Sequence, residues 1–344
     1  MSRGSHSPFA RVRGAIAWAL LVPAFAWCAG QIASDRWWWS QWLFWIPPAV
    51  PLACALAAVG VSLRAGSRAA SAPVRSTQRA GGARGIWASR RLVALRAIAC
   101  AAAVATGAAT LQWMSWGRWT LAVEPASRSA LRIVHLNPRW PGDATDLAAA
   151  MMAQSADVYA ISEAGAVLRA PAVREAEHAG AVTLHVGRFA IVSRCPVREA
   201  RAVYDDGSTA ASWVRFGATD GLPEWTMLMV DAPRRLRVSR REIFTALRAA
   251  LDAMSLGTPD VVVGDMNTTP GSRAVSDAWP SLRDASQEAG RGVRGTFPRE
   301  LPLWAIDRCL LTPKWRIIEW RSWDPGRGAH RGQRIEIDVR PVSP

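Results

Sequence analysis

Long apolar stretches separated by polar connections occupy the first third of the chain. They run over residues 14–33, 42–63 and 92–113, and each has about the 20 residues that a helix needs to cross a bilayer. Tryptophans cluster in the first connection, as in the aromatic belts of membrane proteins. A cleaved signal peptide would explain only the first stretch. The pattern therefore predicts three transmembrane helices within a membrane anchor over residues 1–120.

The positive charge lies mainly among these apolar stretches. Before Pro125, thirteen arginines stand against two acids, whereas 29 basic residues face 25 acidic ones from Pro125 on. Seven of the arginines, and no acid, lie in the connection 64–91. The positive-inside rule then predicts a cytoplasmic N-terminus, a basic cytoplasmic loop 64–91 and an extracytoplasmic C-terminal domain in the cell membrane. Membrane lipids are the expected partners, and a basic groove for nucleic acid has little support.

Short apolar runs alternate with helical patterns over residues 130–344. Runs such as "LRIVHLN", "DVYAISE" and "DVVVGDMN" have the length of strands, and "SRREIFTALRAALDAM" repeats its apolar positions at helical spacing. Cys195 and Cys309 lie in apolar runs, and no cysteine spacing indicates a zinc site. We therefore expect one α/β domain over residues 130–344, with buried thiols or with a disulfide if the fold brings Cys195 and Cys309 together.

Several of the predicted strands end on a polar side chain. These side chains are Asn137, Glu163, Asp265 with Asn267, and Asp307, and the isolated His330 follows near the C-terminus. If the strands lie side by side, the polar groups meet at one edge of the sheets. Such a cluster of oxygens suits a hard cation such as Mg²⁺, or it can hold and polarise a water molecule.

These motifs resemble the endonuclease/exonuclease/phosphatase superfamily of divalent-metal phosphoesterases. "GDMNTTP" is close to its Gly-Asp-x-Asn signature, "DVYAISE" resembles its glutamate motif, and "GAHRGQRIEIDV" resembles its closing histidine motif. The resemblance implies a four-layer α/β sandwich, in which helices flank two mainly antiparallel sheets. The arrangement of spans further resembles bacterial membrane members of the vancomycin/teicoplanin-resistance type.

The resemblance also assigns a role to each polar residue. It implies that Glu163 binds the metal, Mg²⁺ or Mn²⁺, with Asn137 beside it. Asp265 would hold the attacking water and Asn267 would donate to the phosphoryl oxygens. The remaining pair is Asp307 and His330, in which the carboxylate would fix the tautomer of the imidazole.

Two positions depart from the family pattern. The family often carries a histidine where this chain has Asp231, and its closing motif is usually Ser-Asp-His where this chain has Gly328-Ala329-His330. The loss of that aspartate removes a ligand for a second metal. A site with one metal is still expected, and a weakened or inactive enzyme is the alternative.

Two classes of function follow from these patterns. The first is a membrane-anchored, metal-dependent phosphoesterase hydrolase that acts outside the cytoplasm on a phosphate ester, such as a lipid-linked phosphate or diphosphate. An extracytoplasmic nuclease is the less favoured form of this hypothesis. The second class is a binding or scaffold module that keeps the fold without turnover.

Overall fold

The computed structural model describes residues 8–70, 82–113, 130–139, 144–163, 165–219 and 221–340. The chain divides into two compact units. One contains Met1–Ile32 and Ile46–Trp113, and the other contains Ala33–Trp45 and Met114–Pro344. Ala33–Trp45 belongs with the second unit, although it lies within the predicted anchor. We call Ala33–Trp45 the interhelix segment.

The first unit consists of the helices α1 (Pro8–Ala33), α3 (Ala49–Ala70) and α4 (Gly82–Trp113). Small and apolar side chains form its core, among them Ala17, Ala58 and Ala99. In the described part of the chain, two helical stretches are long and apolar enough to cross a membrane, Val12–Ala33 and Val93–Gln112. Such stretches also occur in signal sequences and in the cores of soluble proteins, so they allow membrane association without establishing it.

The second predicted span, residues 42–63, is not one helix. The short helix α2 (Ser40–Phe44) ends before Pro47 and Pro48, and α3 begins at Ala49. Proline has no amide hydrogen to donate and disfavours a helical residue before it, which explains the break. The apolar part of α3, Ala49–Arg64, is shorter than the other two stretches.

The predicted loop 64–91 is also shorter than expected. Helix α3 continues to Ala70 and α4 already begins at Gly82. The part of this prediction that concerns residues 71–81 lies outside the described residues.

The second unit is built on two mixed sheets of six strands each. The first sheet has the order β11-β12-β1-β2-β4-β3 and consists of β1 (Ala130–Leu136), β2 (Val158–Ser162), β3 (Val182–Val186), β4 (Phe189–Ser193), β11 (Arg316–Trp323) and β12 (Gly332–Asp338). The second sheet has the order β5-β6-β7-β8-β10-β9 and consists of β5 (Val197–Asp205), β6 (Ala210–Phe216), β7 (Trp225–Asp231), β8 (Val261–Asp265), β9 (Arg283–Asp284) and β10 (Asp307–Leu311).

Most neighbouring strands run antiparallel, as the resemblance implies. The exceptions are β1 with β2 and β7 with β8, which are parallel. Parallel strands have their carboxyl ends at the same edge of the sheet, so the carboxyl ends of the two strands in each parallel pair lie side by side.

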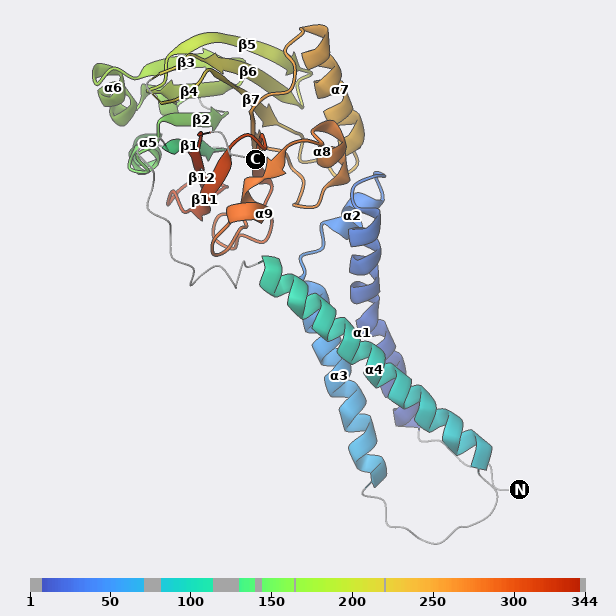
Figure 1. The fold of residues 1–344 in the computed structure, drawn as a ribbon. Helices are drawn as coiled ribbons and strands as arrows, with labels where there is room; N and C mark the ends of the chain where they lie inside the picture. The colour runs from blue at the N-terminus through green and yellow to red at the C-terminus, as the bar shows by residue number, and fades with distance from the viewer. Residues whose placement is uncertain are drawn as a thin grey trace. The chain divides into compact units, whose positions relative to one another are not determined.

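Helices cover the outer face of each sheet (Figure 1). Helices α5 (Ala144–Met152) and α6 (Pro171–His178) pack on the first sheet, and α7 (Arg240–Ala253) and α8 (Arg273–Ala278) pack on the second. The short helix α9 (Ala285–Ala289) lies beside β11. The largest core cluster combines side chains of both sheets and therefore lies between them.

The three valines of β8 illustrate this layered packing. Val261 and Val263 belong to the core between the sheets, whereas Val262 packs with α7 and α8 on the outer face. Successive side chains of a strand point to opposite faces, so a strand buried on both faces needs an unbroken apolar run.

Three strands escaped the sequence analysis: β3, β5 and the two-residue strand β9. Each lies at an edge of its sheet, and the side chains of β3 and β5 are partly or fully exposed. The polar composition of β5 hides its strand pattern. The disulfide between Cys195 and Cys309 is not formed, since both are free, buried thiols of the central core.

Candidate active site

The strand topology brings the predicted site residues to one edge of the two sheets. Asn137 and Glu163 directly follow the parallel strands β1 and β2, and Asp265 ends β8. Asp307 begins β10, which runs antiparallel to β8 and pairs Asp307 with Asp265. His330 precedes β12, which runs antiparallel to β1.

The signature loop, residues 264–272, begins with a glycine for a steric reason. Gly264 has φ +150°, and a Cβ atom there would lie 1.8 Å from the carbonyl oxygen of Val230 on β7. Only glycine allows the strands to approach this closely. The close approach places Asp265 beside Asp231, its register partner at the end of β7.

Asp265 is buried, and hydrogen bonds of Asp265 and Asn267 together connect the signature loop with the ends of β1 and β7. Its Oδ1 accepts from the backbone amide of Asn267 at 3.0 Å, and its Oδ2 accepts from Nδ2 of Asn137 at 3.2 Å. Nδ2 of Asn267 donates to the carbonyl oxygen of Ala232 at 2.8 Å. An asparagine amide has two N–H groups, so a second donor of Asn267 remains for a phosphoryl oxygen.

Two of the site residues have strained backbones. Glu163 has φ 49° and Asn267 has φ 45°, in the left-handed region that most residues avoid. Each such residue costs about 1–3 kcal/mol and persists only where the surroundings enforce it, as they commonly do at active sites.

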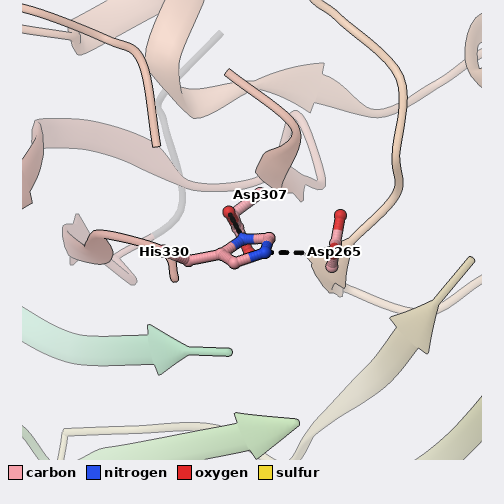
Figure 2. Close-up of side chains that lie close together, drawn as sticks. All are labelled: Asp265, Asp307 and His330. Carbon is pink, nitrogen blue, oxygen red and sulfur yellow. Dashed lines mark hydrogen bonds and ion pairs between the residues drawn. The ribbon is translucent and has the colours of Figure 1, made fainter. Parts of the chain in front are cut away.

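Asp307 and His330 form a buried pair beside Asp265. Nδ1 of His330 lies 2.8 Å from Oδ2 of Asp307, and Nε2 lies 3.9 Å from Oδ2 of Asp265. Figure 2 shows the imidazole between the two carboxylates. The pairing that the resemblance implies, with Asp307 orienting His330, is therefore the geometry of this chain, while the catalytic role of the pair stays a prediction.

The charges of this pair stabilise each other. Burial alone would lower the pKa of His330, but the charge and hydrogen bond of Asp307 and the charge of Asp265 raise it to about 9. Burial would raise the pKa of Asp307, but the charge and hydrogen bond of His330 hold it below its ordinary value. Nδ1 of His330 therefore carries a proton that is directed at Asp307.

His135 is a buried histidine that the sequence analysis missed. Its Nδ1 lies 3.9 Å from Oδ1 of Asp307, and its Nε2 lies 3.1 Å from Oγ of Ser162. Burial is the main reason that its pKa falls to about 4, so the ring is neutral. The only sequence signal was a polar residue inside the apolar run of β1.

A cavity of about 290 Å³ opens at the sheet edge where the predicted site residues meet. We call it the pocket; its polar lining residues include Asn137, Glu163, Asp231, Asp265, Asn267 and the arginines Arg139, Arg188, Arg234 and Arg235. Asp307 and His330 are buried and are not among the lining residues.

Asp231 adds a carboxylate to the pocket at the position where the family often has a histidine. Its pKa is raised to about 7, mainly by burial and next by the nearby charge of Glu163. Burial, with the charge of Asp307, also raises the pKa of Asp265 well above its ordinary value. Carboxylates with raised pKa values in one pocket are better accommodated when a cation is present.

The donor atoms fit a hard divalent cation. Oδ1 of Asn137 is buried and has no hydrogen-bond partner among the described residues, and it shares the pocket with the carboxylates of Glu163 and Asp265. Oxygen ligands of this kind suit Mg²⁺ or Mn²⁺. A second group, Asp265, Asp307 and His330, also has ligand atoms within 4.8 Å of one another. Within this second group, Nδ1 of His330 and Oδ2 of Asp307 already bind each other, whereas Nε2 of His330 and Oδ1 of Asp307 have no hydrogen-bond partner among the described residues.

Solved structures similar to this chain include proteins from Bacteroides thetaiotaomicron and from D. rerio. An endonuclease/exonuclease/phosphatase family protein from Bacteroides thetaiotaomicron has 14% identity over 60% of this chain and 97% of its own, with TM-score 0.49. The mannosyl-6-phosphatase of B. thetaiotaomicron VPI-5482 has 15% identity over 60% and 99%, with TM-score 0.49. D. rerio TDP2, complexed with a single-strand DNA product, has 14% identity over 61% and 99%, with TM-score 0.45.

Comparison with curated proteins finds no match to this chain. The model of the endonuclease/exonuclease/phosphatase family, in contrast, matches residues 111–330, from the end of α4 through His330. This match spans more than half of the chain. The chain therefore belongs to the endonuclease/exonuclease/phosphatase family, whose members are typically hydrolases.

Proposed function

We propose that this chain is a divalent-metal-dependent phosphoesterase. The observation that carries the proposal is the pocket itself, in which Glu163, Asp265 and the unpaired Oδ1 of Asn137 come together next to the buried Asp307–His330 pair. The residues match the chemistry of phosphate-ester hydrolysis, which needs charge neutralisation, a positioned water molecule and proton transfer.

Each residue has one task in this proposal. Glu163 and Asn137 hold Mg²⁺ or Mn²⁺, which neutralises charge on the phosphoryl group when bound. Asp265 accepts a hydrogen bond from the attacking water, and Asn267 donates to a phosphoryl oxygen. His330, oriented by Asp307, places its Nε2 toward the same centre.

The arginines of the pocket favour a substrate with more than one anionic group. Arg234 and Arg235 are exposed on the loop after β7, and Arg188 binds Asp205 while lining the same pocket. One guanidinium group can bind two phosphate oxygens at once. Several arginines in one pocket therefore suit a diphosphate. Together with the apolar helices of the first unit, this lining favours a lipid-linked phosphate or diphosphate over nucleic acid.

An assay of the detergent-solubilised full chain tests this proposal. Mg²⁺ or Mn²⁺ should support hydrolysis of a lipid diphosphate in mixed micelles, while p-nitrophenyl phosphate, bis-p-nitrophenyl phosphate and single-stranded DNA serve as competing substrate classes. Preference for DNA would favour a nuclease. No hydrolysis of any substrate, with intact metal binding, would favour the binding or scaffold module.

The absent aspartate of the closing motif gives a further prediction. Ala329 is half-buried and its carbonyl oxygen accepts from the amide of Arg299 at 2.9 Å. Because Asp231 already supplies a carboxylate beside Asp265, Ala329→Asp should change kcat by less than about tenfold, a smaller effect than loss of a general acid–base group. Steady-state kinetics of the variant and the parent measure it. A large gain in kcat would instead identify a site that had decayed at this position.

We further propose a multi-pass protein of the cell membrane with an extracytoplasmic catalytic domain. The arginine-rich connection 64–91 supports this orientation through the positive-inside rule. A reporter enzyme that works only outside the cytoplasm should then be active when it is fused after Pro344. Activity of a reporter that works only in the cytoplasm would contradict the proposed topology.

A further inference from the structure

The interhelix segment supplies a buried carboxylate to the catalytic unit. Asp35 is fully buried, although it lies in the connection between α1 and α3 and about 230 positions before the signature loop. It is the only acid before Glu124. A buried charge is costly unless it is paired and hydrogen-bonded, so the contacts of Asp35 indicate why it is there.

Outside its own segment, Asp35 forms hydrogen bonds with the signature loop and with the start of α8. Its Oδ2 accepts from Oγ1 of Thr268 at 3.1 Å and from Oγ of Ser272. Its Oδ1 accepts from the backbone amide of Ala274 at 3.1 Å. Thr268 directly follows Asn267, so Asp35 holds the loop one residue beyond the asparagine that the proposed mechanism uses.

Ser34 reinforces this attachment through the backbone. Its Oγ donates to the carbonyl oxygen of Gly271 at 3.1 Å and accepts from the amide of Arg273 at 3.2 Å. Oδ1 of Asp35, also 3.1 Å away, is an alternative acceptor for the single hydrogen of this hydroxyl. The ring of Phe44 lies 3.9 Å from where a Cβ atom of Gly271 would stand. The whole turn 271–274 is therefore in contact with the interhelix segment.

A buried arginine connects Asp35 electrostatically with the signature aspartate. Arg240 is fully buried and its Nε donates to the carbonyl oxygen of Asn267 at 2.9 Å. Burial lowers the pKa of Arg240 to about 10, while the charges of Asp265 and Asp35 both raise it. The negative charges of Asp35 and Asp265 therefore both stabilise the guanidinium of Arg240, and this guanidinium holds the backbone of Asn267.

The same segment contacts two other loops of the site. Nε2 of Gln41 donates to the carbonyl oxygens of Leu236 and Val238, at 3.2 and 3.1 Å, in the loop that carries Arg234 and Arg235. The carbonyl oxygen of Trp45 accepts from Nε1 of Trp304 at 2.8 Å. The ring of Trp304 packs against Phe297, whose ring lies 4.9 Å from that of His330.

We propose that Asp35 is a positioning residue of the active site, which acts through Thr268 and Ser272 to hold Asp265 and Asn267 in their working conformation. The left-handed backbone of Asn267 needs such support, because a strained residue persists only where its surroundings enforce it. The expected effect of Asp35 on turnover rests on the proposed phosphoesterase function. Its expected effect on the conformation of the signature loop does not.

The experiment compares two variants of the full chain, Asp35→Ala and Asp260→Ala. Asp260 is the matched control, because it also accepts from a backbone amide and a hydroxyl, those of Thr226 at 3.0 and 3.1 Å, but precedes β8 at the end opposite the site. Both changes should lower the melting temperature. Only Asp35→Ala should lower kcat by about 10–100-fold, the loss typical of supporting groups around metal sites, with KM little changed.

Hydrogen exchange of the backbone amides of residues 266–275 provides a readout that needs no turnover. Exchange there should accelerate in Asp35→Ala and stay at the parent rate in Asp260→Ala. Asp35→Asn should restore most of kcat, because its amide can still accept from Ala274 and donate to the two hydroxyls. If Asp35→Ala does not fold, Thr268→Val, which removes one donor, should give smaller changes in the same direction.

The outcomes separate the two proposals. Unchanged exchange over residues 266–275 in Asp35→Ala overturns the positioning role, whatever the activity. Accelerated exchange with a kcat no lower than that of Asp260→Ala also overturns it. A parent chain without hydrolysis overturns the phosphoesterase proposal instead, and accelerated exchange then still supports the structural role of Asp35.

Discussion

Replacing His330 with alanine is expected to lower kcat for phosphate-ester hydrolysis by about 10²–10⁴-fold, the usual contribution of a general acid–base group. His330 is buried, its Nδ1 is fixed by Asp307 at 2.8 Å, and its Nε2 faces Asp265. No other described histidine is positioned to replace it, since His135 is held neutral behind Asp307 by burial. Steady-state kinetics with saturating Mn²⁺ measure the loss.

The matched control is His185→Ala, the same substitution at an exposed position on the edge strand β3. It should leave kcat unchanged. Equal residual hydrolysis by the parent and by His330→Ala would show that the activity comes from a contaminant. That result would favour a binding or scaffold module with the family fold.

Replacing Glu163 with glutamine is expected to weaken Mn²⁺ binding by at least about tenfold, or roughly 1.4 kcal/mol. The substitution removes a negative charge from an oxygen-ligand site while it keeps the shape of the side chain. Glu163 is exposed at the end of β2, so the fold should survive. Calorimetric titration of the parent and variant chains with Mn²⁺ compares the affinities.

Glu224→Gln controls for the general loss of one negative charge, because Glu224 is exposed and pairs only weakly with Arg215 at 3.7 Å. Its Mn²⁺ affinity should equal that of the parent. A third variant, Asp307→Asn, decides between the two groups of possible ligands. If Asp307→Asn abolishes binding and Glu163→Gln does not, the cation lies among Asp265, Asp307 and His330, and our assignment is wrong.

The sequence predicted the strand ends of the site well, because two local signals coincide there. A buried strand is an unbroken apolar run, and the first polar residue after it marks the sheet edge, as for Asn137, Glu163 and Asp265. The hydrogen bond between Asp307 and His330 was implied by the family resemblance and is present in this fold.

Residues without a local signal were missed. His135 is the next-to-last residue of β1, where a polar residue looks like an interruption of the apolar pattern. Asp35 lies in a connection between apolar helices and belongs to no motif, so only the tertiary fold reveals its partners Thr268 and Ser272. The break at Pro47 and Pro48 is visible in the sequence, but hydrophobicity alone extended the predicted span across it.

The interhelix segment also limits how the chain can be threaded through a bilayer. Asp35 and the signature loop are in hydrogen-bond contact, so they must lie on the same side of any membrane. Between them in sequence lie α3 and α4. An even number of crossings must separate two segments on one side, and if α4 spans a membrane, α3 must span it too, despite its shorter apolar part. The even number of crossings between these two segments then follows from one buried carboxylate, and not from hydropathy.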